Sequence, residues 1–238
     1  MVSEIGGIQP VGDLRELIES FGVPVIFAEM PDRIHGITVH EDFDGIWRGV
    51  VVVNCRDSWT RQRFTLAHEL AHIIYRDSQP IIIDDDQEVD ESNRVEFRAE
   101  CFARYFLVPA EGLSKSLLNV DGVESAAMVA NTMLHFGVSR PAAMRALAES
   151  TQMSYEYLNG MAGAGSVRDL MARSRLDVEW STLSRDQHDE SASPWLLELA
   201  LDAYREKYVP AQLVADVLGR GDETDSVEAD LVAQGWAH

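Results

Sequence analysis

The chain has 238 residues, of which 46% are hydrophobic, enough for one large domain or for a core domain with an appended lobe. Forty acidic residues against 20 basic ones give a formal net charge of −20. A surface this acidic repels phosphate backbones, so we expect no direct contact with nucleic acid. The two cysteines lie far apart and in no CxxC pair, which excludes a disulfide framework and a thiolate zinc site.

The sequence also bears on the cellular compartment. Its first residues have neither the basic nor the apolar stretch of a secretory signal, and no apolar run approaches the length of a membrane span. Two unpaired cysteines fit a reducing environment. We therefore expect a cytoplasmic protein with no membrane partner.

The first 55 residues predict one short helix followed by a small, mostly antiparallel sheet. Residues 13–21 have helical spacing with a capping aspartate and a terminating glycine. Strand patterns follow at 23–28, 34–40 and 46–55, the last containing four consecutive valines. The acidic stretch 41–45 is predicted to be a hairpin turn.

Helical patterns dominate the remainder. Two long helices are expected at 59–76 and 93–107, separated by an acidic solvated loop. Shorter helices are predicted at 111–118, 123–136 and 139–149. Residues 153–187, with several glycines, predict loop and linker. We therefore expect an α+β fold with a core domain at 1–150, an irregular linker at 151–192 and a C-terminal helical extension at 193–238.

The helix predicted at 59–76 contains the pentapeptide His-Glu-Leu-Ala-His at residues 68–72. His68 and His72 project from one helix face and can bind the same metal ion. Glu69 points about 100° away around the helix, where it can reach a water on that ion and act as general base. The alternative is a surface helix whose glutamate forms an ion pair. Since the flanking sequence is too apolar for an exposed helix, we predict a zinc site.

A zinc site needs at least three protein ligands, and the helix predicted at 93–107 offers two glutamates on a face shared with small alanines. Glu96 is the first choice as ligand. Glu100, one turn further on, can then orient His68 or His72 through its free ring nitrogen. The spacing also permits the reverse assignment, and for Glu100 a surface ion pair with Arg104 is an equal alternative.

Two blocks of sequence resemble the ImmA/IrrE metallopeptidase family. The first is R-F-T-L-A-H-E-L-A-H at 63–72, preceded by V-V-V-V-N at 50–54. The second is E-F-R-A-E-C-F-A at 96–103, followed by F-L-V-P at 106–109. The resemblance covers roughly residues 10–150. Two positions depart from the family pattern: Ala71 stands where glycine is common, and Glu100 where asparagine or aspartate is frequent.

The resemblance implies a gluzincin-like, zincin-type core that holds one Zn²⁺ per chain through His68, His72 and Glu96, with Glu69 as the catalytic base. Family members cleave or inactivate helix-turn-helix repressors. The resemblance thus implies a zinc-dependent metalloendopeptidase that hydrolyses a peptide bond in an intracellular regulatory protein, a helix-turn-helix repressor or an antitoxin encoded as a separate chain. The alternative is a non-catalytic zinc-containing module that antagonises a transcriptional regulator by binding or acts in a toxin–antitoxin pair.

Two further sequence patterns allow other interpretations. Residues 123–149 have the layout of a helix-turn-helix, but the segment is not clearly basic, and we expect a packed helical pair instead. In the C-terminal extension, an apolar stripe is expected to pack a small helical lobe rather than dock a partner. Its residues are Trp195, Leu199, Leu213 and Val217.

Overall fold

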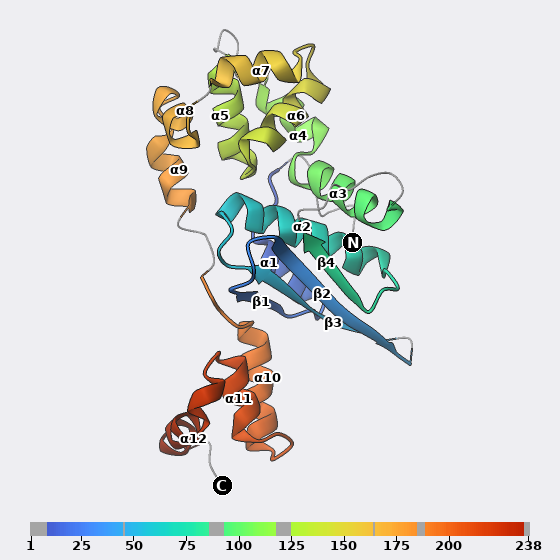
Figure 1. Ribbon diagram of the computed structural model, residues 1–238, viewed down its shortest axis with the longest axis vertical. Coiled ribbons are helices and arrows are strands. Elements are labelled where there is room, and N and C mark those ends of the chain that lie inside the picture. The colour runs from blue at the N-terminus through green and yellow to red at the C-terminus, as the bar shows by residue number, and fades with distance from the viewer. Residues whose placement is uncertain are drawn as a thin grey trace.

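The computed structural model describes residues 9–44, 46–85, 93–117, 125–163, 165–184 and 189–235. Its long axis runs from a group of helices at one end, through a layer of sheet and helix, to a second group of helices at the other end (Figure 1). The α+β architecture expected from the sequence is therefore confirmed.

The sheet has four strands in the order β1-β3-β2-β4. β1 pairs with β3 in parallel, whereas β2 is antiparallel to both β3 and β4. The prediction of a small, mostly antiparallel sheet is thus confirmed, with one parallel pairing. The strands are β1 (Val25–Ala28), β2 (Ile34–Phe43), β3 (Ile46–Asn54) and β4 (Ile81–Asp85).

Two sequence predictions in this region were wrong. The acidic stretch 41–45 is not all turn, because β2 runs on to Phe43 and pairs with the start of β3. Part of the loop expected between the two long helices forms strand β4, where Ile82 and Asp84 face inward and Ile81 and Ile83 face solvent. The apolar alternation of a strand is present there, but the acidic run that follows obscured it. The rest of that expected loop, 86–92, lies outside the described residues.

Helix α2 (Trp59–Tyr75) covers one face of the sheet beside α1 (Leu14–Ser20), and α3 (Arg94–Leu107) lies along α2 (Figure 1). The covered face is apolar, with Val25, Phe27, Val51 and Val53 fully buried beneath the helices. Most residues of α2 are buried, which holds the helix in place against the sheet. The apolar sequence around the histidines predicts this burial.

A layer of six helices continues from α3 and packs into the same core. Residues 153–187 were expected to be loop and linker, and this was wrong: three of the helices lie there. Ser154 and Ser166 cap two of them, and the buried side chains of Leu158 and Leu170 join the main core. The six helices are α4 (Ala110–Leu117), α5 (Ser125–Phe136), α6 (Arg140–Ser150), α7 (Tyr155–Ala162), α8 (Val167–Arg173) and α9 (Asp177–Leu183).

The C-terminal extension is helical, as predicted, and has a small core of its own centred on Val214, Ala215 and Val227. The stripe expected to form this core is mostly exposed, because α10 turns a neighbouring apolar row, including Leu197 and Leu201, toward the other helices. Of the predicted stripe only Val217 packs there. The elements are α10 (Pro194–Arg205), α11 (Ala211–Val217), the short 3-10 helix η2 (Gly221–Glu223) and α12 (Thr224–Ala233).

In the part of the chain that the structure describes, no helix combines the length and the apolar character needed to cross a membrane.

Candidate metal centre

Three potential metal ligands converge where α2 and α3 pack together. His68 and His72 lie one turn apart on α2, and Glu96 lies in the first turn of α3. One carboxylate oxygen of Glu96 is 3.0 Å from Nε2 of His68 and 3.7 Å from Nε2 of His72. One ligand atom from each residue falls within 4.8 Å of the others. The residues proposed as ligands from the sequence are thus brought to one point.

The donor set fits a divalent metal ion. Two imidazole nitrogens and a carboxylate oxygen are the ligand types of zinc centres that retain an open position. Nε2 of His72 is buried and has no hydrogen-bond partner among the described residues. A buried polar atom without a partner is costly, and an ion bound between these three side chains would remove that cost.

Electrostatics within the cluster show the mutual attraction of its members. Burial opposes the charged carboxylate of Glu96, but its hydrogen bond with His68 and the nearby imidazole of His72 outweigh that effect and lower the pKa of Glu96 to about 2. Burial likewise opposes a charged His72, yet contacts with Glu96, Glu69 and Asp77 raise its pKa to about 9. The carboxylates therefore hold a positive charge at the place where a cation would bind.

Asp77 orients His72, a contact that the sequence analysis missed. Its Oδ2 lies 2.8 Å from Nδ1 of His72, which directs Nε2 toward the cluster. Asp77 can reach back because α2 ends at Arg76 in the left-handed conformation. Its second oxygen accepts a hydrogen bond from Arg98 of α3, whose guanidinium lies 4.2 Å from the centre of the Tyr75 ring. An acidic residue directly after the helix end was the available signal.

Glu69 is completely buried between α2 and strand β2. The hydroxyl of Thr38 donates a 2.6 Å hydrogen bond to its Oε2, whereas Oε1 has no partner among the described residues. Gly36 permits this close packing, since a Cβ there would lie 2.5 Å from Oε1 of Glu69. Burial raises the pKa of Glu69 to about 7, against the opposing effect of the two histidines. A carboxyl with this pKa can take up and release a proton near neutral pH.

Glu100 lies apart from the histidines. Its carboxylate is 3.9 Å from the guanidinium of Arg145 on α6, and it borders a cavity beside the cluster. The role of orienting a histidine, considered for Glu100, falls to Asp77 at His72. The alternative pair between Glu100 and Arg104 is also not formed, because Arg104 pairs with Glu149 at 2.5 Å.

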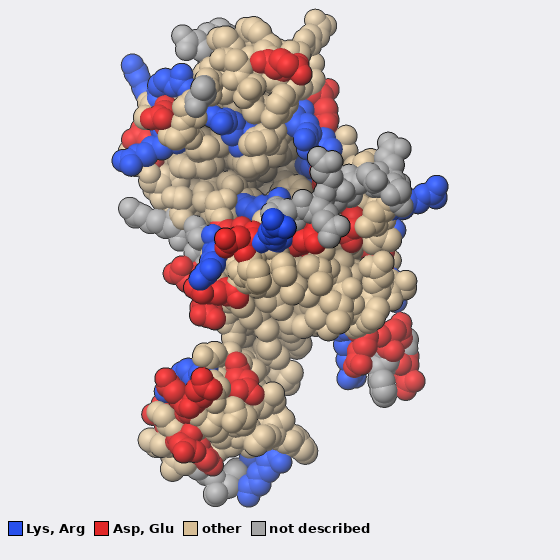
Figure 2. All heavy atoms as spheres, in the orientation of Figure 1, with Lys and Arg blue, Asp and Glu red and all other residues tan. Residues whose placement is uncertain are grey.

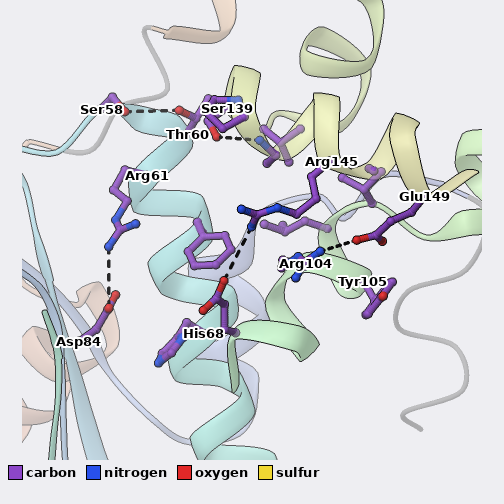
Figure 3. Close-up of a pocket in the computed structure, with 18 of the residues that line it drawn as sticks. Ser58, Thr60, Arg61, His68, Asp84, Arg104, Tyr105, Ser139, Arg145 and Glu149 are labelled. Carbon is purple, nitrogen blue, oxygen red and sulfur yellow. Dashed lines mark hydrogen bonds and ion pairs between the residues drawn. The ribbon is translucent and has the colours of Figure 1, made fainter. Parts of the chain in front are cut away.

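The cavity has a volume of about 830 Å³ and lies between α2, α3 and α6, with His68 in its wall. Figure 3 shows Arg104, Arg145 and Glu149 reaching across it from α3 and α6. In the space-filling view a hollow bordered by both basic and acidic side chains lies between the helices at one end and the sheet layer (Figure 2). The volume of the cavity beside His68 falls within the range of cavities that bury small ligands.

Histidines elsewhere make no comparable cluster among the described residues. His35 pairs with Asp57 at 2.8 Å, at the start of α2 and away from the ligand cluster. His188 and His238 lie outside the described residues.

A mixed sheet covered by a helix with two histidines, and a glutamate from the next helix beside them, define a zincin-like metallopeptidase. Residues 18–148 match the IrrE N-terminal-like domain, peptidase M78. The match covers more than half of the chain, which therefore belongs to this ImmA/IrrE metallopeptidase family. A search of curated proteins found no match.

Proposed function

We propose that the chain is a zinc-dependent endopeptidase and that His68, His72 and Glu96 hold the ion. A donor set of two nitrogens and one oxygen suits Zn²⁺, whereas magnesium and calcium prefer sites made of oxygen ligands alone. When bound, zinc supplies a Lewis acid that polarises a carbonyl and lowers the pKa of a coordinated water toward neutrality. Asp77 keeps His72 in the tautomer that presents Nε2.

The buried carboxylate of Glu69 is the observation that carries this proposal. Thr38 holds one of its oxygens, and the other, which has no hydrogen-bond partner in the described part of the chain, would accept a proton from the attacking water. A pKa near 7 lets Glu69 then pass the proton to the leaving amine without a large energetic cost in either direction. Water is otherwise excluded from this carboxylate, which strengthens its interaction with developing charge.

The proposed substrate is an intracellular regulatory protein, a helix-turn-helix repressor or an antitoxin, as the family resemblance implies. Strand β4 is an edge strand among the described residues and lies beside the cavity through Asp84 and Asp85. An extended segment of substrate can add to this edge by backbone hydrogen bonds. This arrangement would bring a peptide past His68.

The test is Glu69→Gln, which keeps the size of the side chain and removes its proton acceptor. We expect zinc content and thermal stability close to those of the parent chain, with cleavage of a candidate regulator at least 100-fold slower. Cleavage would be followed by electrophoresis and mass spectrometry. Glu111→Gln, at an exposed residue paired with Lys115, is the matched control and should cleave normally.

The rival is a non-catalytic module that antagonises a regulator by contact alone. In that case Glu69→Gln would retain the full biological effect of the parent chain while no fragment of the partner appeared. Such an outcome would exclude the peptidase proposal.

A further inference from the structure

The cavity beside His68 has an apolar floor and a charged but neutralised rim. Phe64 on α2 and Ala142 and Ala146 on α6 line its interior and are each half-buried, so part of their surface faces the open space. The ring of Phe64 lies 6.5 Å from that of His68, centre to centre. The apolar floor therefore begins directly beside a proposed metal ligand.

Where α3 and α6 border the cavity, its rim carries two ion pairs that cross between these helices. Glu100 and Arg104 lie one turn apart on α3, and Arg145 and Glu149 lie one turn apart on α6. Glu100 pairs with Arg145 at 3.9 Å, and Arg104 pairs with Glu149 at 2.5 Å (Figure 3). Each helix contributes one acid and one base, so this side of the rim bears no net charge.

We propose that this cavity is the subsite for one large, uncharged apolar side chain of the substrate, and that Ala142 and Ala146 set its depth while the crossed pairs exclude charged side chains. The proposal rests on the peptidase function and deepens it. A charged side chain entering the cavity would lose its hydration against Phe64 and the alanines, and each of the four rim charges on α3 and α6 already has an opposite partner. An apolar side chain gains from the same burial.

The alanines are the sharpest test because a larger residue at either position fills space that the substrate needs. Leucine at 146 would project from α6 into the cavity between α3 and α2. Since the position is half-buried beside an open volume, the substitution does not overpack a closed core. Ala229→Leu, at an exposed alanine on α12, is the matched control.

The first measurement is independent of catalysis. Zinc-loaded Glu69→Gln protein is titrated with two hydroxamates that differ in one side chain, benzyl in one and hydrogen in the other. We expect the benzyl compound to bind at least tenfold more tightly. Ala146→Leu or Ala142→Leu in the same background should reduce this ratio to about twofold or less, and Ala229→Leu should leave it unchanged. Equal affinities for the two compounds, or an unchanged ratio in both alanine variants, would overturn the subsite.

The second measurement uses the active chain and a randomised synthetic peptide library, with the products sequenced. One position next to the scissile bond should favour bulky apolar residues about tenfold or more over alanine, and Ala146→Leu should remove that preference. If no peptide is cleaved while the hydroxamate ratio behaves as expected, the peptidase proposal fails and the subsite stands. If peptides are cleaved but Ala146→Leu does not change the side-chain preference, the subsite proposal fails and the peptidase proposal stands.

The rim is tested by Arg145→Ala, which leaves Glu100 without its partner. Because the pair is long and half-exposed, its loss should cost the fold little. The unpaired carboxylate should then accept a basic side chain, so that an aminobutyl hydroxamate gains at least threefold in affinity relative to the parent chain. No gain would overturn the role assigned to the rim.

Discussion

At the scale of single residues, Gly36 is a position where β2 packs tightly against α2. Any Cβ at this position would meet Glu69 Oε1 and Thr65 Cγ2, both at 2.5 Å. For Gly36→Ala we therefore expect β2 to shift away from α2 and the Glu69 carboxylate to leave its position. The free energy of unfolding should fall by about 1–3 kcal/mol, and hydrolysis should slow at least tenfold. Thermal unfolding and cleavage rates provide the measurements.

Gly160→Ala is the control for the glycine substitution itself. Gly160 lies in α7, and a Cβ there meets no atom within 4 Å. Alanine should stabilise this helix by up to about 1 kcal/mol and leave the cleavage rate unaltered. Equal effects of both substitutions would contradict the role assigned to Gly36.

Asp77 orients the proposed ligand His72 and is not itself a proposed ligand. Asp77→Ala removes the acceptor for Nδ1 of His72 and leaves the guanidinium of Arg98 without its carboxylate. The imidazole can then rotate or change tautomer, so zinc affinity should fall about 10- to 100-fold. Competition with a chromophoric chelator measures this affinity directly.

Asp57→Ala supplies the matched control, because Asp57 makes the same kind of 2.8 Å contact with His35 outside the cluster. It should change stability but not zinc affinity. If Asp77→Ala bound zinc as tightly as Asp57→Ala, Asp77 would have no orienting role.

The residues that converge at the cluster differ in how far the sequence reveals them. The spacing of His68 and His72 follows from helical geometry alone, and the family resemblance selects Glu96. Neither spacing nor the resemblance points to Asp77 or Thr38, although an acidic residue directly after the helix end was a weak signal for Asp77. The contact of Asp77 depends on the left-handed backbone at the end of α2. The contact of Thr38 depends on how β2 packs against α2, which no local sequence pattern encodes.

At the scale of elements, the long helices and the valine-rich strand were predictable because each has a strong period of its own. Strand β4 and helices α7–α9 are short, and their boundaries depend on partners distant in the chain. α8, for example, begins with a capping box between Ser166 and Asp169, a local signal that the neighbouring glycines obscured. Likewise Glu100 finds Arg145 across the cavity instead of Arg104 on its own helix.

At the scale of the whole molecule, the helices after residue 150 divide into two groups. Leu158, Ala162, Leu170 and Met171 are fully buried in the core that also contains the underside of α2. Trp180 of α9 packs against Trp59 of α2 with ring centres 5.0 Å apart. We therefore infer that helices α7–α9 fold together with the sheet and α2, in which case a domain boundary at residue 150 would cut through the shared core.

The helices α10–α12 have a separate small core and contribute no residue to the metal cluster. Their attachment begins at Ser191, which pairs with Phe27 of β1, and at Ala192, whose carbonyl accepts a hydrogen bond from Arg15. The chain thus reaches the exposed edge of β1 before it enters the C-terminal helices.

Two truncations test this division of the chain. A fragment of residues 1–193 keeps the whole main core and the pairing with β1, so it should fold, bind zinc with the parent affinity and unfold cooperatively. A fragment of residues 1–150 loses Leu158, Leu170 and Met171. Their burial is worth roughly 5–9 kcal/mol together, comparable with the net stability of a typical domain. The 1–150 fragment should therefore aggregate or bind zinc poorly, which calorimetry and zinc analysis would measure. A stable, zinc-binding 1–150 fragment would place α7–α9 outside the folding unit.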